Sequence, residues 1–261
     1  MTTSVAALPQ MPRASRKMAA VLNRWFYFGM TLLATAVVAY GFGRQIEPRL
    51  LEGPPRPVIL WVHSILFSFW MAFLIVQSAL VRVRNVKMHR TLGWSGAGLA
   101  TAMTVVGVIT SVVMARFEVQ YLNAHPLFAL GGMHSSELAR LRLAGQLVSL
   151  WNIACFTALF WLAVYWRRKP EMHRRLILLA TCMLLAPAFS RFPEPFVSGN
   201  SYYWVDAVIL LGVARDLIVT RRVHKVYYCV LPILIVGQQF VVHTMLAEPA
   251  WWMRIASFIV R

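Results

Sequence analysis

Charged residues are scarce in this sequence. They make up 13% of the 261 residues, whereas hydrophobic residues make up 59% and the mean hydropathy is +0.61. Soluble domains carry about 25% charged and about 45–50% apolar residues, so this chain has too few polar side chains to cover a water-exposed surface. The composition excludes a soluble globular domain and a disordered chain, and it predicts a polytopic membrane protein.

Acidic residues are especially few: nine Asp and Glu stand against 26 Lys and Arg, which gives a formal net charge of +17. On a soluble chain such a charge would suggest a nucleic-acid partner. In a membrane protein, basic residues gather instead in the segments on the cytoplasmic side. Because the basic residues of this chain follow that pattern, as shown below, we expect no nucleic-acid partner.

Cysteine is also rare, and the usual catalytic motifs are missing. The three cysteines, Cys155, Cys182 and Cys229, lie in apolar runs without motif spacing, which excludes a disulfide framework and a cysteine-based zinc site. The sequence has no phosphate-binding glycine loop, no His-Glu-x-x-His pair and no Gly-x-Ser-x-Gly motif. Whether the protein is an enzyme is left open.

Long hydrophobic runs dominate the chain. A membrane-spanning helix needs about 20 mostly apolar residues, and the fifth qualifying run is short and contains Pro187, which predicts a kink. Residues 251–260 are too few to cross and predict a helix at the membrane interface. We therefore expect an all-α polytopic transmembrane bundle of about seven spans, forming one domain (21–261) after a flexible basic cytoplasmic tail (1–20). The runs are 24–43, 58–81, 92–115, 145–166, 175–191, 202–220 and 226–247.

The basic residues predict how these spans are oriented. Alternate connecting segments hold 17 of the 26 Lys and Arg residues, and the remaining segments hold nine. Because cytoplasmic segments are the ones enriched in Lys and Arg, we expect a cytoplasmic N-terminus and an external C-terminus in a bacterial inner (plasma) membrane. The basic segments are 13–24, 82–90, 167–175 and 215–225.

A short motif recurs where the odd-numbered spans begin. Met-His-Arg occurs at 88–90 and again at 172–174, and His224-Lys225 is a weaker third copy. The basic residues could simply anchor the chain to anionic lipids, with the histidines accompanying them. Alternatively, His89 and His173, and with them His224, act as neutral imidazole ligands or proton-exchange groups at the inner surface.

At these residues the sequence resembles uncharacterised bacterial multi-pass inner-membrane proteins. The resemblance rests on an Asn-x-x-x-His-Arg element (Asn85–Arg90) that opens a span and on a further intramembrane histidine before it. It covers mainly residues 58–115 and 165–190. One related group is implicated in assembling haem-containing terminal oxidases. The resemblance implies a helical membrane bundle and a link to haem or to respiratory-chain maturation, and it supplies no catalytic residues.

A second set of polar residues lies within the spans at one depth, near the ends opposite the basic segments. Placing such residues inside a membrane costs free energy, so we treat them as candidates for a functional site. They could line one shared cavity, or they could serve only to join helices, with Arg191 and Asp206 pairing. The set consists of His63, Gln146, Ser149, Asn152, Arg191, Asp206, Gln239 and His243.

These residues support three hypotheses of different classes. The first is a haem-associated protein, either a b-type electron carrier or a respiratory oxidase assembly factor, because haem iron accepts axial histidines. Haem b would be held by His63 with His243, or by His89 with His173. The second is a non-redox protein that binds or transports a small solute in the cavity of Asn152, Arg191, Asp206 and Gln239. The third is a structural membrane subunit. The expected partners are the lipid bilayer and respiratory-chain proteins.

Overall fold

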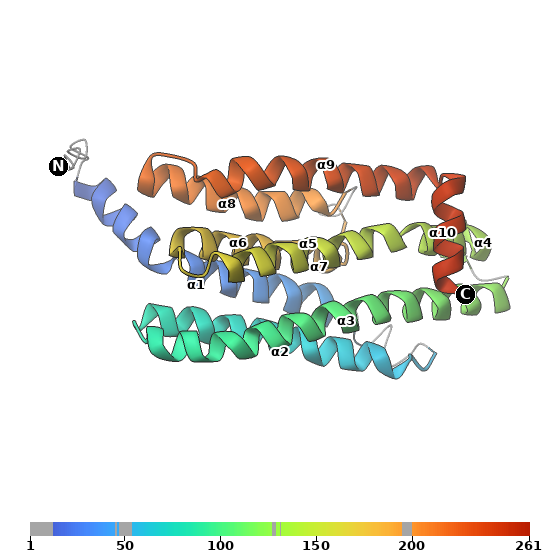
Figure 1. The fold of residues 1–261 in the computed structure, drawn as a ribbon. Helices are drawn as coiled ribbons and strands as arrows, with labels where there is room; N and C mark the ends of the chain where they lie inside the picture. Colours follow the sequence, from blue (N-terminus) through green and yellow to red (C-terminus); the bar gives the residue numbers. More distant parts are fainter. Residues whose placement is uncertain (1–12, 45, 47–53, 127–128, 131, 195–199) are drawn as a thin grey trace.

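The computed structural model describes residues 13–44, 46, 54–126, 129–130, 132–194 and 200–261 (Figure 1). The chain is built almost entirely of helices, as predicted, with one short antiparallel β-ladder that pairs Ala129 with His134. The elements are α1 (Arg13–Gly43), α2 (Val58–Arg82), α3 (Val86–Ala124), β1 (Ala129–Leu130), β2 (Met133–His134), α4 (Ser135–Ala144), α5 (Gln146–Tyr165), α6 (Pro170–Met183), α7 (Ala186–Phe189), α8 (Tyr202–Thr220), α9 (Lys225–Ala247) and α10 (Ala250–Val260).

The long helices run side by side in an up-and-down bundle (Figure 1). In this view α8 and α9 form one side, α2 and α3 form the other, and α5 and α6 lie between them; α5 packs against both α3 and α9. The turns 83–85, 166–169 and 221–224 all lie at the end where α1 begins, which we call the basic end. The basic segments therefore share one end, as their alternation along the sequence predicts.

Six helices among the described residues are long and apolar enough to cross a membrane: α1, α2, α3, α4 continued by α5, α6 continued by α7, and α9. The run 202–220, predicted as a further span, does form helix α8. However, α8 carries Asp206, Arg215 and Asp216 within its 19 residues, so it falls outside this apolar set. The chain is an integral membrane protein by the length and composition of its helices.

Several helix ends differ from the predicted boundaries for local reasons. Helix α1 begins at Arg13, inside the expected tail 1–20, whose first 12 residues lie outside the described part. Helix α3 continues to Ala124, because the next helix-breaking signal is the His125-Pro126 pair. The predicted break near Pro187 is confirmed: α6 ends at Met183, and α7 restarts with Pro187 in its first turn.

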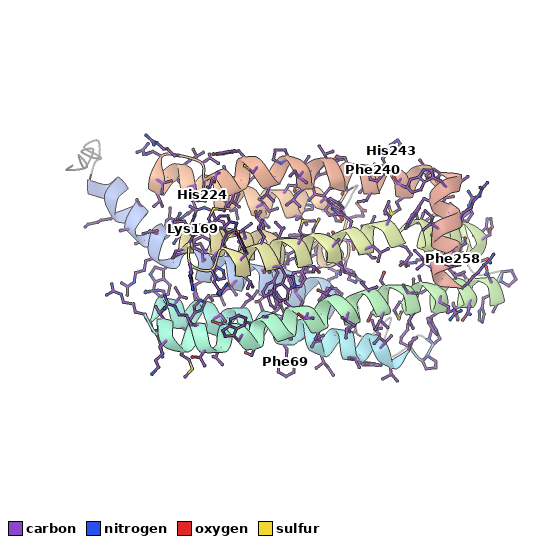
Figure 2. The ribbon with its side chains drawn as sticks, viewed as in Figure 1. Phe69, Lys169, His224, Phe240, His243 and Phe258 are labelled. Atoms are coloured by element: carbon purple, nitrogen blue, oxygen red, sulfur yellow. The ribbon has the colours of Figure 1, made fainter. Side chains whose placement is uncertain are left out.

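The interior is apolar, and so is most of the outer surface, as a lipid-facing bundle requires. Trp70 is fully buried and meets Phe156 and Phe160 edge-to-face, with ring centroids 5.2 and 5.7 Å away. On the other face of α2, Phe69 is 63% exposed and points away from the bundle (Figure 2). Because such rings would be costly in water, this surface is suited to contact with lipid.

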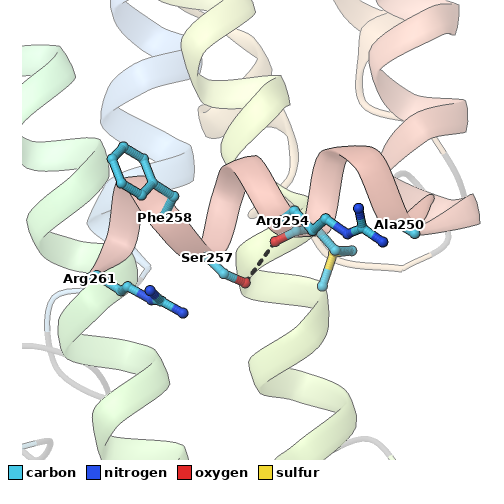
Figure 3. Close-up of a pocket in the computed structure, with 6 residues that line it drawn as sticks. Ala250, Arg254, Ser257, Phe258 and Arg261 are labelled. Atoms are coloured by element: carbon cyan, nitrogen blue, oxygen red, sulfur yellow. Dashed lines mark hydrogen bonds between the residues drawn. The ribbon is translucent and has the colours of Figure 1, made fainter.

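Helix α10 crosses the end of the bundle opposite the basic end (Figure 1). Its Trp252 is buried, and Nε1 of this residue donates a hydrogen bond to the Ala144 carbonyl at 2.9 Å. A hollow of about 600 Å³ runs along α10, and its lining residues come from this helix and from Arg261, which follows it (Figure 3). Phe258, on the rim of this hollow, is 76% exposed. The hollow is a surface groove and does not enter the bundle.

Candidate functional site

The structure brings His89 and His173 together at the basic end. Their ring centroids lie 6.3 Å apart, with the ring planes at 77°. His89 lies in the first turn of α3, which begins after Asn85, whose Oδ1 accepts a hydrogen bond from the Met88 amide at 3.2 Å. His173 lies in the first turn of α6, which Pro170 starts. The two Met-His-Arg motifs therefore converge because each opens a helix at the same end of the bundle.

A backbone carbonyl lies beside each of these rings. Nδ1 of His173 lies 2.9 Å from the Ala163 carbonyl, to which it must donate, so Nε2 carries the free lone pair. The Gln77 carbonyl lies beside the His89 ring, and Nδ1 of His89 is buried without a partner among the described residues. Metal-binding histidines usually donate their second ring nitrogen in this way, so His173 has the tautomer that a ligand needs.

A polar side chain without a partner lies beside this pair. The Gln77 side chain is 7% exposed, and both atoms of its amide are buried without a hydrogen bond. Buried amides are nearly always paired, so this site has donor and acceptor capacity that the described residues do not fill. Sequence reasoning missed Gln77, although a glutamine five residues from the end of an apolar span is a usable signal.

His224, the third histidine of the repeat, has a different role. It precedes α9 as its N-cap, where Nδ1 accepts a hydrogen bond from the Val226 amide at 3.3 Å. Burial, and then the charge of Arg175, lower the pKa of His224, which favours the neutral ring that this acceptor role needs. His224 therefore caps a helix rather than joining the His89–His173 pair.

The predicted pairing of His63 with His243 does not form. His63 lies on α2 and His243 on α9, which are on opposite sides of the bundle (Figure 1). His63 is half-buried, stacked on Phe67 at 3.9 Å between ring centroids, and His243 is exposed on the outer face of α9 (Figure 2). Helix packing places the two imidazoles too far apart to bind one iron.

The predicted polar cavity is only partly assembled. Asn152 is buried, and its Oδ1 accepts a hydrogen bond from the Tyr202 hydroxyl at 2.7 Å, which joins α5 to α8. Asp206 lies one turn along α8, where the side chain of Gln238 is within hydrogen-bonding reach. The predicted Gln239 is exposed, whereas Gln238 is fully buried. The expectation was wrong by one residue, because one step along a helix turns a side chain by about 100°.

Arg191 follows α7 and contacts both α7 and α1. Its guanidinium donates to the Pro187 carbonyl and lies over the Phe42 ring, 4.5 Å from the ring centroid. Among the described residues, no ion pair joins Arg191 to Asp206.

The hydrogen bond between Tyr202 and Asn152 allows a simple test of the helix-joining role. Tyr202→Phe removes the donor and leaves the ring in place, so we expect a loss of about 0.6 kcal/mol in the free energy of unfolding, the average for such bonds in membrane proteins. Unfolding in mixed detergent micelles measures it. Tyr203→Phe, an exposed neighbour, should change nothing; equal losses in both variants would contradict this role.

A buried cluster of charges at the basic end was missed. Asp216 is fully buried and accepts hydrogen bonds from Nε of Arg175 at 2.9 Å and from NH1 of Arg215 at 2.8 Å. Arg175 also bonds Glu171 at 2.7 Å, and Arg215 bonds Asn23 of α1. The cluster thus connects α1, α6 and α8.

The sequence counted two of these arginines only toward the orientation of the spans. Arg175 and Arg215 were counted among the membrane-anchoring bases, but both are almost fully buried. The signal that could have found the cluster is Arg215-Asp216 itself, a charged pair inside the apolar run 202–220. Opposite charges inside a span imply a buried partner.

No group of three or more His, Cys, Asp or Glu side chains in the described part of the chain is placed to hold a metal ion. No protein-family model, curated protein or solved structure matches the chain.

Proposed function

We propose that this chain is an integral inner-membrane protein of bacteria that binds haem b through His89 and His173. The observation that carries the proposal is the convergence of two imidazoles from different helices, with ring centroids 6.3 Å apart and a backbone carbonyl beside each ring. That separation leaves room for one metal ion whose two nitrogen ligands each lie about 2 Å away.

Haem suits this donor set better than a bare metal ion does. A mononuclear protein site normally needs three or four protein ligands, and the described residues offer no such group. Haem iron needs only its axial ligands from the protein. His89 and His173 would hold the iron, the carbonyls of Gln77 and Ala163 would keep the rings oriented, and the unpaired Gln77 amide would offer a hydrogen bond.

Bound haem would supply one-electron chemistry at the basic end. The protein then acts either as a b-type electron carrier or as a factor in respiratory oxidase assembly, with respiratory-chain proteins as partners. The resemblance of 58–115 and 165–190 to uncharacterised bacterial inner-membrane proteins, one related group of which is implicated in assembling haem-containing oxidases, supports this choice. We further propose that α8 is a seventh span and that the basic end faces the cytoplasm, because 17 of the 26 basic residues lie there.

The visible spectrum of the detergent-purified protein, oxidised and reduced, tests the proposal. We expect a Soret band in the wild type after haem supplementation and its loss in His89→Ala and His173→Ala, because each variant removes one axial ligand. His243→Ala, on the exposed face of α9, is the matched control and should keep the band. No band in the wild type, or a band that survives both substitutions, would disprove haem ligation here.

A further inference from the structure

A cluster of arginines lies around Trp25 at the basic end. Trp25 is on α1 and is 44% exposed, and the guanidinium carbon of Arg82, in the last turn of α2, lies 3.6 Å from the centroid of its ring. The guanidinium carbon of Arg24 lies 6.0 Å from the same centroid. Arg84, in the turn 83–85, is exposed and close enough to Arg82 to act on its charge. We call these four residues the Trp25 cluster.

The arginines of the Trp25 cluster have no acidic partner. Neither α1 nor α2 contains an Asp or Glu residue, and none of the ion pairs among the described residues includes Arg24, Arg82 or Arg84. The Arg82 side chain makes no hydrogen bond within this part of the chain, and its Nε is buried without a partner. The cluster therefore carries positive charge that no described group neutralises.

A second aromatic ring of α1 provides a direct comparison. The guanidinium carbons of Arg174 and Arg215 lie 4.8 and 5.6 Å from the centroid of the Tyr27 ring. Here each arginine has a carboxylate: Arg174 pairs with Glu171, and Arg215 pairs with Asp216. The same combination of one ring and two guanidiniums is thus neutralised at Tyr27 by the protein itself, whereas at Trp25 the anion must come from elsewhere.

The position of the Trp25 cluster indicates the source of that anion. Helix α2 has 25 residues and is about 37 Å long, which exceeds the hydrocarbon thickness of about 30 Å, so its ends reach the lipid headgroups. Val21, one turn before Trp25, and Val83, next to Arg82, are both exposed. Lipid phosphates therefore lie at the depth of the arginines, and acyl chains can cover the apolar side chains beside them.

We propose that the Trp25 cluster binds the phosphate of an anionic phospholipid. A guanidinium that stacks on an aromatic ring presents its N–H donors at its edge, and this fork matches two phosphate oxygens. Arg82 is therefore the main contact, and Arg24 and Arg84 add charge. A zwitterionic headgroup would bring its own cation to these arginines, so the site favours a lipid with net negative charge. None of these residues belongs to the His89–His173 pair.

Native mass spectrometry of the detergent-purified protein tests this proposal, with phosphatidylglycerol as the probe. We expect the wild type to bind it and Arg82→Gln to lose about tenfold in affinity, because hydrogen bonds between charged groups are the strong ones. Arg24→Gln, at an exposed position that tolerates substitution, should weaken binding as well. Arg168→Gln is the matched control: it removes one exposed charge from the turn 166–169 at the same end and should bind as the wild type does.

Three results would overturn the proposal. One is equal affinity for phosphatidylglycerol and for phosphatidylcholine with the same acyl chains. Another is an equal loss in Arg82→Gln and Arg168→Gln, which would assign binding to the total charge of the basic end. The third is displacement of the lipid by an equal concentration of inorganic phosphate, which would make free phosphate the ligand. Lipid binding is measured without haem, which keeps this test separate from the previous one.

Discussion

Replacing Asp216 by alanine is expected to lower the free energy of unfolding by about 3–5 kcal/mol, the usual effect of removing one partner from a buried ion pair. Asp216 is the only acceptor that Nε of Arg175 has among the described residues, and it also binds Arg215. Both guanidiniums are almost fully buried, so the variant leaves two cations in the interior without this counter-charge. Equilibrium unfolding in mixed detergent micelles measures the loss.

Glu171→Ala is the matched control for this prediction. Glu171 binds the same Arg175, but its side chain is 53% exposed, so water can replace it. Half-exposed ion pairs contribute about 0–1 kcal/mol, and we expect a loss within that range. If Asp216→Ala is no more destabilising than Glu171→Ala, the buried cluster is not what joins α1, α6 and α8.

Gly41→Ala is the second substitution expected to have a large effect, a loss of about 1–3 kcal/mol, as overpacking of a close contact causes. A methyl group at position 41 would collide with the backbone carbonyl of Ala188 in α7. A backbone atom cannot rotate away as a side chain can, so α1 must move off α7. The unfolding temperature of the detergent-solubilised protein measures this effect.

Gly29, on the same helix α1, provides the comparison. A methyl group at position 29 has no neighbour within 4 Å. Alanine is favoured over glycine inside a helix by about 0.5–1 kcal/mol, so Gly29→Ala should leave stability unchanged or slightly raised. Equal destabilisation by both substitutions would mean that the approach of α1 to α7 does not set the result.

The sequence predicted the elements well and their contacts poorly. The break before Pro187 and the grouping of the basic segments at one end follow from local signals, and the structure has both. The convergence of His89 with His173 was also predictable, because each opens a helix at the same end. His63 and His243 share a depth in the same way, yet they lie on opposite sides of the bundle. Depth along a span is readable from sequence, whereas position around the bundle is not.

The sequence by itself determined that this protein is a membrane-embedded helical bundle, since apolar runs of spanning length and asymmetric basic residues are properties of the chain alone. Only the tertiary structure decided which polar groups meet. It turned Gln238 inward and Gln239 outward, and it buried Arg175 and Arg215 around Asp216. The reason is that a helix that is apolar on all sides has little sequence pattern to determine which face turns inward. Packing against the neighbouring helices therefore determines the rotation of each helix about its own axis.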